Sequence, residues 1–572
     1  MDYKQEYQRW LASDKVDEAT KKELLALDGN DEEIKFRFIS YLAFGTGGLR
    51  GTMIAGMNAM NVYTVAHATQ GFANLILKEG KADRGVVIAH DSRNNSDIFS
   101  RVTAEVFAAN GIKVYFFDSL RPTPVLSFAI RYLGTIAGVN VTASHNPKEY
   151  NGYKAYWEDG AQLSLEQADL VSSYINATDI FDGVKRMDFD TAVAEGKIEI
   201  VGTVIDDAFV QNVTAQLVDK NAIPAIADDL KVVYTPLHGC GHRLVPEVLR
   251  LCGLKHLYTV GAQMVIDGNF PTVKSPNPEY PEALSLGMKL AEKVGSDLVL
   301  ATDPDADRVG IAVRNAENQF VTITGNQVGA LLLDYVLTAY ENTGTMPEKP
   351  YAVKTIVTTE LATKICREHN VDLYNVLTGF KFIGEVIKNH DDIGDGNYLL
   401  GFEESYGYLK GTYARDKDSV VASMLIVEMA AYYKAKGMTL YDALVNMFEK
   451  YGHYVEHTVN VTMPGLDGVE KMKALMNDLR KNPPAEIGGK KVVAIRDYQA
   501  ETITDLITGA VTPTGLPASN VLYFECEGGN VVVVRPSGTE PKIKLYLLVN
   551  GACANCCKAT LEAFKKTVEA WT

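Results

Sequence analysis

The sequence lacks the features that mark membrane-spanning, secreted and fibrous proteins. None of its apolar stretches approaches the length of about 18 uncharged residues that a membrane helix requires. The first residues, Met1-Asp2-Tyr3-Lys4-Gln5-Glu6, do not follow the basic-then-apolar order of a secretory signal. Low-complexity tracts and short internal repeats are also missing. We therefore expect a cytoplasmic protein built from ordinary globular domains.

Cysteine is scarce as well. The chain has seven cysteines, which should stay reduced in the cytoplasm, so we expect no disulfide framework. Cys553 and Cys556 are spaced as Cys-x-x-Cys, but no second pair or histidine follows that would complete a metal site. Apolar residues at helical spacing instead predict the buried face of a helix, which consists of Cys553, Cys557, Leu561, Phe564 and Val568.

Positive charge is in deficit. The chain has 56 lysines and arginines against 72 aspartates and glutamates, which gives a net charge of -16. Nucleic acids and anionic membranes would be repelled at long range, so we expect neither as a partner. A small anionic substrate would need a local group of cations.

The length of 572 residues is too great for one hydrophobic core and predicts about three or four domains. Before residue 455, strand-like and helix-like segments alternate as in parallel α/β sheets, and the alternation restarts near residues 205 and 325. Beyond residue 455, two amphipathic helices flank antiparallel-looking strands, which is typical of a smaller α+β domain. The predicted domains are 1–204, 205–324, 325–454 and 455–572.

One polar hexapeptide, Thr142-Ala143-Ser144-His145-Asn146-Pro147, directly follows the apolar run 136–141. The run predicts a short buried strand, and the Asn-Pro turn would hold the Ser144 hydroxyl at a loop tip, where chemistry is usually placed. Taken alone, such a segment is more often an ordinary turn. Polar loops after other strands make Ser144 the candidate nucleophile.

Carboxylates recur at alternate positions in Asp303-Pro304-Asp305-Ala306-Asp307-Arg308, after the strand-like segment 297–302. In an extended segment alternate side chains point the same way, so the three aspartates could share one hard cation. A calcium EF-hand would need Gly and Glu where this sequence has Arg308 and Arg314. The expected ion is therefore Mg²⁺, with a solvated acidic turn as the alternative.

Other loops carry groups that suit a phosphate. The segment 44–51 has four glycines among eight residues and contains Arg50, so its backbone can approach a ligand beside a cation. Arg535, Ser537 and the backbone of Gly538 and Thr539 offer donors for a dianionic phosphate, although an ordinary β-turn remains the alternative.

A further loop suits a sugar. Glu403 and Ser405 offer acceptors for adjacent hydroxyls, although a Glu-Glu-Ser segment alone is weak evidence. This loop and the loops at Ser144, Asp303 and Arg535 each follow an apolar strand, and ligands bind at that edge of α/β sheets. We therefore predict one composite site.

Together these motifs resemble the α-D-phosphohexomutase superfamily. The matching segments, in chain order, are Thr-Ala-Ser-His-Asn-Pro, Asp-Pro-Asp-Ala-Asp-Arg, Gly-x-Glu-Glu-Ser and Arg-Pro-Ser-Gly-Thr-Glu-Pro. The resemblance extends from about residue 44 to residue 544. It implies three α/β domains with mixed, mostly parallel sheets and a C-terminal α+β domain, arranged around a central active-site cleft.

The resemblance also implies a role for individual residues. Ser144 would carry a phosphoryl group and, with three aspartates, hold Mg²⁺. The implied metal site is Ser144, Asp303, Asp305 and Asp307, and the implied catalytic residues are Ser144, His145, Lys154, Lys417 and Arg308. The implied substrate-binding residues are Arg50, Thr378, Gly379, Lys381, Glu403, Ser405, Arg535, Ser537, Gly538 and Thr539.

The implied activity is interconversion of glucose 1-phosphate and glucose 6-phosphate by a monomer or homodimer. The phosphoserine would give its phosphoryl group to the sugar phosphate, and glucose 1,6-bisphosphate would be the intermediate. Glu403-Glu404-Ser405 resembles the glucose-type loop more than the Glu-Met-Ser-Gly-His of phosphomannomutases. A phosphopentomutase or a phosphomannomutase remains the alternative within the superfamily, and a Mg²⁺-dependent sugar-phosphate phosphatase or a non-catalytic sensor would belong to another class.

Overall fold

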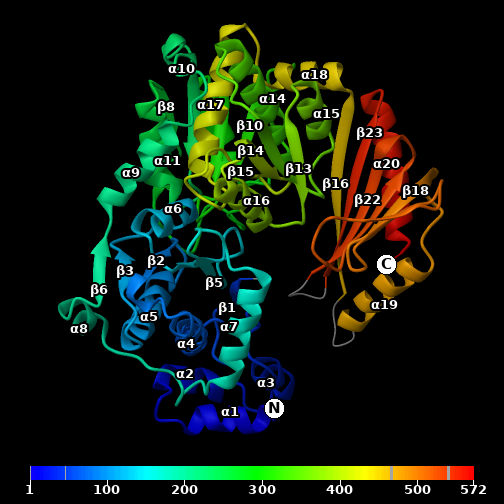
Figure 1. The fold of residues 1–572 in the computed structure, drawn as a ribbon. Helices are drawn as coiled ribbons and strands as arrows, with labels where there is room; N and C mark the ends of the chain where they lie inside the picture. Colours follow the sequence, from blue (N-terminus) through cyan, green and yellow to red (C-terminus); the bar gives the residue numbers. More distant parts are fainter. Residues whose placement is uncertain (1, 46, 464–467, 538–541, 572) are drawn as a thin grey trace. The chain divides into compact units, whose positions relative to one another are not determined.

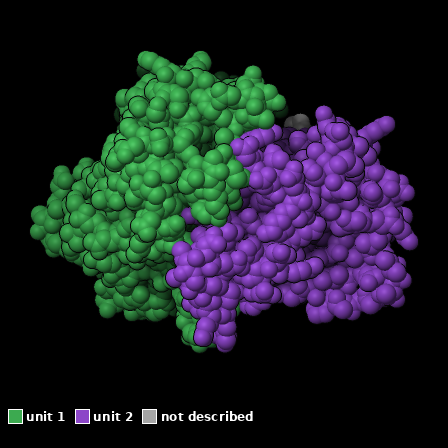
Figure 2. Space-filling model, turned by 90° about the horizontal axis from the view of Figure 1, so that it is seen from above, with its two compact units in different colours: residues 1–323, 384–394, 406–439 green, residues 324–383, 395–405, 440–572 purple. Residues whose placement is uncertain are grey.

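The structure is a computed structural model that describes residues 2–45, 47–463, 468–537 and 542–571. The chain divides into two compact units, which Figure 2 shows in different colours. The first unit comprises residues 1–323, 384–394 and 406–439, and the second comprises 324–383, 395–405 and 440–572. Among the described residues, no helix is both long and apolar enough to cross a membrane.

The N-terminal segment is helical. Aspartate or asparagine caps each of its helices, and Trp10 and Phe38 are fully buried between them. Ile180 and Phe181 join the same apolar cluster, so the segment is part of the first unit's core. The helices are α1 (Tyr3–Ala12), α2 (Glu18–Leu25) and α3 (Asp31–Phe38).

The first α/β sheet has the order β1-β5-β4-β2-β3-β6. Strands β2, β3, β4 and β6 are parallel, and β5 and β1 extend the sheet in antiparallel fashion. The strands are β1 (Gly48–Thr52), β2 (Val86–His90), β3 (Val114–Phe117), β4 (Ala137–Val141), β5 (Tyr150–Trp157) and β6 (Ile198–Val201). The helices are α4 (Val62–Lys78), α5 (Ser96–Ala109), α6 (Thr123–Leu133), α7 (Leu165–Ala177) and α8 (Phe189–Ala194).

The second sheet of this unit has the order β11-β10-β9-β7-β8. Its parallel part is β8-β7-β9, and β10 and β11 continue it as antiparallel hairpins. The strands are β7 (Lys231–Thr235), β8 (His256–Thr259), β9 (Leu298–Thr302), β10 (Val309–Arg314) and β11 (Phe320–Ile323); β15 (Gly407–Leu409) lies in the same unit. The helices are α9 (Thr203–Thr214), α10 (Ala222–Ala225), α11 (Gly241–Leu251), α12 (Gly261–Met264), α13 (Ser285–Val294) and α17 (Ser419–Ala435).

The second unit begins with a third parallel arrangement, in which β12 pairs with β13 and β14 on its two sides. The strands are β12 (Pro350–Thr355), β13 (Asp372–Val376) and β14 (Asn397–Glu403). The accompanying helices are α14 (Gly325–Thr343), α15 (Leu361–Glu368) and α18 (Leu440–Tyr451), and α16 (Phe380–Ile393) begins in this unit.

The C-terminal part of the second unit is an antiparallel sheet in the order β16-β23-β22-β21-β18-β19-β20, with β17 beside β18. Figure 1 labels β16, β23, β22 and β18 of this sheet. Helix α20 packs against β16 and β23, and its apolar face joins the core of the sheet. The strands are β16 (His453–Thr462), β17 (Glu486–Ile487), β18 (Lys490–Asp497), β19 (Thr502–Asp505), β20 (Val511–Pro513), β21 (Leu522–Cys526), β22 (Asn530–Pro536) and β23 (Lys542–Gly551). The helices are α19 (Gly468–Lys481) and α20 (Ala554–Glu569).

The predicted fold class is confirmed, because three α/β parts precede a C-terminal α+β part. The prediction for the cysteines is partly wrong. Cys557 lies on the buried face of α20, as expected, but Cys553 precedes the helix and forms a disulfide with Cys556. Residues three apart at a helix start lie on the same side, and here their Cα atoms are 5.2 Å apart.

Candidate active site

The Ser144 loop leaves the sheet at the end of β4 and returns as β5. Ser144 has a φ of +52°, in the left-handed region, and is only 2% exposed. Its N–H donates to Thr142 Oγ1 at 2.8 Å, and its hydroxyl donates to Asp303 Oδ2 at 2.8 Å. The loop therefore presents the Ser144 oxygen to the aspartate loop of the second sheet.

A buried arginine that the sequence analysis did not select holds this loop. Arg93 Nη1 donates to the carbonyls of Pro147 and Tyr150 at 3.0 and 3.1 Å, and Nη2 donates to those of Asn146, at 2.6 Å, and Ser144. Arg93 follows β2, the parallel neighbour of β4, which explains its reach across 51 residues of sequence. The signal available in the sequence was an arginine three residues after the end of a predicted strand.

Asp91 balances the charge of Arg93 and anchors the same loop. Its carboxylate lies 3.2 Å from Arg93 Nε and accepts the Thr142 hydroxyl at 2.6 Å and the Ser96 hydroxyl at 2.7 Å. Asp91 and Arg93 are 1% and 3% exposed. A buried network of hydrogen bonds and an ion pair fixes a local conformation, here that of the Ser144 loop.

The three aspartates converge, but by a different route from the one predicted. Residues 303–308 form a turn rather than an extended segment: the N–H of Ala306 donates to the carbonyl of Asp303 at 2.9 Å, and Ala306 has a φ of +51°. Backbone N–H groups of Asp307 and Arg308 donate to Asp303 Oδ1 at 3.1 and 3.0 Å. The turn folds the carboxylates inward.

The geometry of this turn fits a metal ion. One oxygen from each of Asp303, Asp305 and Asp307 lies within 4.8 Å of the others, and all three residues are buried. Within the described part of the chain, Oδ1 of Asp305 and Oδ1 of Asp307 are buried without a hydrogen-bond donor. Buried carboxylate oxygens need a positively charged partner. Three of them together are well suited to bind a hard cation.

Neighbouring loops hold the aspartate turn in place. Thr123 Oγ1 donates to Asp305 Oδ2 at 2.7 Å and itself accepts from Asn140 Nδ2 at 2.7 Å. Gly239, in the loop after β7, packs so closely that an added Cβ would lie 2.4 Å from Pro304. Since β7 and β9 are parallel neighbours, the second sheet repeats the arrangement of the first: one strand delivers the functional loop and its neighbour supports it.

Two lysines lie against the same carboxylates. Lys154 Nζ contacts Asp305 Oδ2 at 2.7 Å and Asp307 Oδ2 at 3.1 Å, and Lys417 Nζ lies 3.1 Å from Asp307 Oδ2. Burial lowers the pKa of Lys154, but Asp305 and Asp307 outweigh burial and raise it. The ammonium group of Lys154 is therefore charged at neutral pH.

His145 links the serine to Arg308. Its Nδ1 lies 3.2 Å from Ser144 Oγ and 2.9 Å from Arg308 Nη1. Burial and the cations Arg308 and Arg50 hold the pKa of His145 well below its usual value, so the imidazole is neutral at pH 7. Arg50, on β1, donates to Asn146 Oδ1 at 3.2 Å. These predicted residues thus surround Ser144 in the first unit.

The second unit carries the loops predicted to bind sugar. Glu403 ends β14 and is 5% exposed, and Ser405 follows it. Burial and the charge of Glu403 raise the pKa of Glu404 to about 7, while Lys544 and Arg535 oppose this rise. The third set of parallel strands is also followed by loops with predicted site residues. Thr378 and Gly379 follow β13, and Lys381 lies in the first turn of α16.

The predicted phosphate loop follows β22. Arg535 lies within the strand pair β22–β23 opposite Lys544, and the N–H of Ser537 donates to the carbonyl of Lys542 at 2.7 Å. Gly538 and Thr539 lie outside the described residues. The positive charges of Arg535 and Lys544 lower the pKa of Glu404, so the predicted phosphate loop and the predicted sugar loop lie close enough to interact electrostatically within the second unit.

Comparison with known proteins identifies the family of this chain. Domains I, II and III of the phosphoglucomutase/phosphomannomutase alpha/beta/alpha families match residues 41–180, 207–317 and 324–451. A phosphoglucomutase of Staphylococcus haemolyticus is 37% identical over 517 residues, which cover 90% of this chain and 91% of that protein. One of Staphylococcus aureus strain MSSA476 is 38% identical over 521 residues, with 91% of each chain covered.

A solved structure agrees with these matches. The crystal structure of pp63/parafusin, a phosphoglucomutase from Paramecium, has a TM-score of 0.68 at 19% identity and covers 93% of this chain and 95% of its own. At this identity the likeness shows the fold alone. The matching domain families and the sequence relatives show that the chain belongs to the phosphoglucomutase/phosphomannomutase family. It is an isomerase of the phosphohexomutase class, as the motifs predicted.

Proposed function

We propose that the enzyme interconverts α-D-glucose 1-phosphate and glucose 6-phosphate through a phosphoserine at Ser144 and a glucose 1,6-bisphosphate intermediate. The observation that carries this proposal is the contact between the buried Ser144 hydroxyl and Asp303, inside a cluster of three carboxylates. The name of the staphylococcal relatives, phosphoglucomutase, supports the choice of glucose.

The proposed cycle moves one phosphoryl group out and another back. The free hydroxyl of the sugar monophosphate attacks phospho-Ser144, the bond from phosphorus to Ser144 Oγ breaks, and the hydroxyl proton passes to a protein base. The bisphosphate then turns over, and Ser144 Oγ takes the other phosphoryl group, leaving the isomeric monophosphate. The protein's task is positioning and charge stabilisation, which is most of what phosphoryl transfer requires.

The charges in the first unit suit this task. Phosphorylation of Ser144 adds about two negative charges. Arg308 and Lys154 supply fixed positive charge nearby, and Mg²⁺ held by Asp303, Asp305 and Asp307 would neutralise the phosphoryl oxygens when bound. Lys154, which is charged, suits the role of proton donor, whereas the neutral imidazole of His145 suits that of acceptor.

The second unit would bind the sugar phosphate. Glu403 and Ser405 offer acceptors to its hydroxyls, with Thr378, Gly379 and Lys381 beside them in the sequence-predicted site. Arg535, Ser537, Gly538 and Thr539 would hold the phosphate that is not being transferred. In the first unit, Arg50 is also a predicted substrate-binding residue. An enzyme that passes through a sugar bisphosphate has to hold one phosphate group while the other is transferred, whereas a simple phosphatase does not.

The decisive test is a coupled assay for glucose 6-phosphate formed from glucose 1-phosphate with Mg²⁺, with and without glucose 1,6-bisphosphate. Ser144→Ala should lower the rate by about 10⁴-fold or more, because no phosphoenzyme can form. The matched control is Ser100→Ala. It removes a buried hydroxyl of α5 that donates a hydrogen bond to the carbonyl of Asp97 in the same helix. Full activity of Ser144→Ala would refute the scheme.

The same assay run with other sugar phosphates distinguishes the alternative activities. Preference for ribose 1-phosphate or mannose 1-phosphate would move the assignment to a phosphopentomutase or a phosphomannomutase. Release of free phosphate without isomer formation would indicate a phosphatase. Mass spectrometry of the protein after incubation with the bisphosphate should find the phosphoryl group on Ser144.

A further inference from the structure

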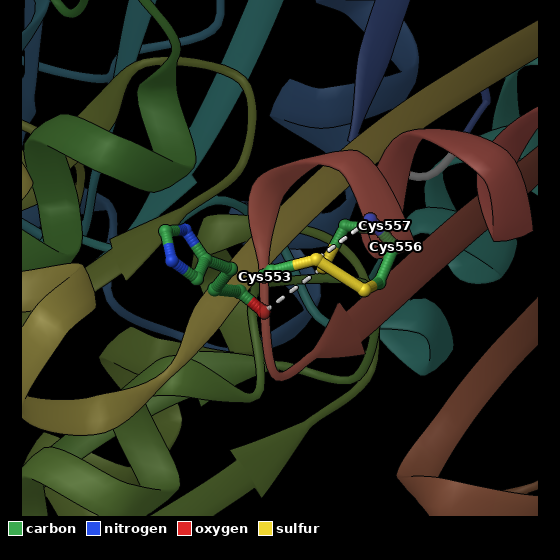
Figure 3. Close-up of a disulfide and its surroundings, with 4 residues drawn as sticks. Cys553, Cys556 and Cys557 are labelled. Atoms are coloured by element: carbon green, nitrogen blue, oxygen red, sulfur yellow. Dashed lines mark hydrogen bonds between the residues drawn. A yellow bond between two sulfur atoms is a disulfide. The ribbon is translucent and has the colours of Figure 1, made fainter.

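The start of α20 carries three cysteines that the proposed mutase chemistry does not use: Cys553 at the N-cap, and Cys556 and Cys557 in the first turn (Figure 3). The sulfur of Cys553, the N-cap residue, is bonded to that of Cys556. We propose that Cys553 and Cys556 form a thiol–disulfide exchange site, which reacts reversibly with low-molecular-weight thiols and disulfides in the folded protein. This inference is independent of the mutase proposal.

Accessibility separates this pair from the other cysteines. Cys556 is exposed and Cys553 is partly exposed, whereas the remaining five cysteines are buried thiols. Burial raises the pKa of Cys252 to about 11 and the pKa of Cys366 and Cys526 to about 12. Since the thiolate is the reactive form, these buried groups are inert, and exchange is confined to the pair.

The helix terminus favours a thiolate on Cys553. The N–H of Cys556 donates to Cys553 Sγ at 3.1 Å, so the sulfur occupies the position of an N-cap acceptor. Helix α20 is 16 residues long, and its first turn contains no acidic residue that would oppose negative charge. The helix dipole and this hydrogen bond both stabilise the anion that forms when the disulfide opens.

Opening the disulfide should leave the fold intact. Only two residues separate the bonded cysteines, so the bond removes little conformational entropy from the unfolded chain. Helix α20 is held instead by its apolar face, which is buried in the core of the C-terminal sheet and consists of Cys557, Leu561, Phe564 and Val568. In addition, the thiol of Cys557 donates to the carbonyl of His453 at 3.4 Å.

The exchange balances with two equivalents of thiol. A thiolate attacks the exposed Cys556 sulfur, the bond between Cys553 and Cys556 breaks, and Cys553 leaves as the stabilised thiolate. A second thiolate then attacks the external sulfur of the mixed disulfide and releases Cys556. The protein disulfide is reduced to two thiols, and two small thiols are oxidised to one small disulfide.

The test is a redox titration of the full chain with reduced and oxidised glutathione. After acid quenching and alkylation, mass spectrometry reads the state of Cys553 and Cys556. We expect a reversible transition within the range of glutathione ratios, an unchanged circular dichroism spectrum and five other cysteines that stay thiols throughout. A pair that stays in one state over the whole range, or that reacts only on unfolding, would overturn the proposal.

Two single variants test the assigned order of attack. Cys553→Ser keeps a good N-cap residue, and Cys556→Ser leaves Cys553 alone at the helix start. At pH 7, Cys553 in Cys556→Ser should be alkylated about 10-fold faster than Cys556 in Cys553→Ser, because its thiolate is stabilised. Equal rates would show that Cys553 is not the favoured leaving thiolate.

Discussion

The proposed phosphoryl-transfer cluster in the first unit and the predicted binding loops in the second unit differ in how deeply their side chains are buried. Ser144 and the three aspartates are 0–2% exposed and are tied to one another and to buried cations. Lys381, Ser405, Arg535 and Ser537 are only partly buried, and Glu403 is the exception. Transfer requires groups fixed before the substrate arrives, whereas recognition requires groups that a ligand can reach.

The two regions nevertheless share a construction rule. Each α/β part places polar loops after neighbouring parallel strands: β2 with β4, β7 with β9, and β12 with β13 and β14. In the first unit, the neighbouring loops add buried support such as Arg93 and Gly239. The difference between the regions therefore comes from the side chains and not from the topology.

The largest expected effect follows from breaking the charge balance of the transfer cluster. Asp307→Asn removes the negative charge that lies against Lys154 and Lys417. It also changes the carboxylate of Asp307, whose Oδ1 is buried without a hydrogen-bond donor. We expect kcat to fall about 10³-fold and the Mg²⁺ concentration for half-maximal rate to rise. Assays over a Mg²⁺ series measure both.

The control for this variant is Asp228→Asn, which changes an exposed carboxylate paired with Lys255. It should behave like the wild type, because exposed ion pairs contribute little. If Asp307→Asn keeps both the normal rate and the normal Mg²⁺ demand, the three carboxylates are not the metal site.

A smaller effect should follow from loosening the Ser144 loop. Arg93→Lys keeps the charge but cannot donate to four carbonyls, as the planar guanidinium does. A misplaced nucleophile slows transfer without changing the binding loops, so kcat should fall about 10²-fold while KM for glucose 1-phosphate stays within about twofold. Steady-state kinetics separate the two constants.

Arg101→Lys is the matched control for the arginine variant, because Arg101 lies on α5 with its guanidinium over the Phe189 ring. Phosphorylation of Ser144 by the bisphosphate should be slow in Arg93→Lys and normal in the control. An equal loss of kcat in both variants would mean that general destabilisation, and not loop positioning, is responsible.

Sequence reasoning could find the loops but not the contacts that hold them. Local signals were sufficient for the strand before Ser144 and for the spacing of the aspartates. The turn at Ala306 was not predicted, because alternate carboxylates fit an extended segment equally well. The support from Arg93 depends on pairing between β2 and β4, which a periodicity pattern does not specify.

Lys154 and Lys417 illustrate the same limit. A lysine in a sequence is usually a surface residue, and only the resemblance to the family selected these two. The structure brings both Nζ atoms to 3.1 Å from Asp307 Oδ2, although 263 positions separate the lysines in the chain. The cysteine prediction went wrong for a related reason, since helical spacing does not reveal that Cys553 is the cap.

In the second unit, Arg535→Lys tests the predicted phosphate grip. Arginine can donate two parallel hydrogen bonds to a phosphate, whereas lysine acts as a point charge. We expect KM for glucose 1-phosphate to rise about 10-fold with a smaller change in kcat, the reverse of the Arg93→Lys pattern. Arg480→Lys, which changes an arginine paired with Asp497, is the control. An unchanged KM would remove Arg535 from the binding site.

The smallest expected effect concerns pH. Burial and Glu403 raise the pKa of Glu404 to about 7, so this carboxyl is mostly neutral at pH 6 and mostly charged at pH 8. Its negative charge would oppose phosphate binding near Arg535 and Lys544, so KM for glucose 1-phosphate should rise roughly threefold from pH 6 to pH 8.

Glu404→Gln removes this titration and should hold KM near its low-pH value over the same range. Titration of the substrate phosphate is common to both proteins, so the difference between their profiles reports Glu404 alone. Glu486→Gln, at an exposed position of β17, should keep the wild-type profile. If KM varies with pH in the same way in Glu404→Gln and in the wild type, the charge of Glu404 does not act on the bound phosphate. The charge with which the second unit binds phosphate would then not depend on pH.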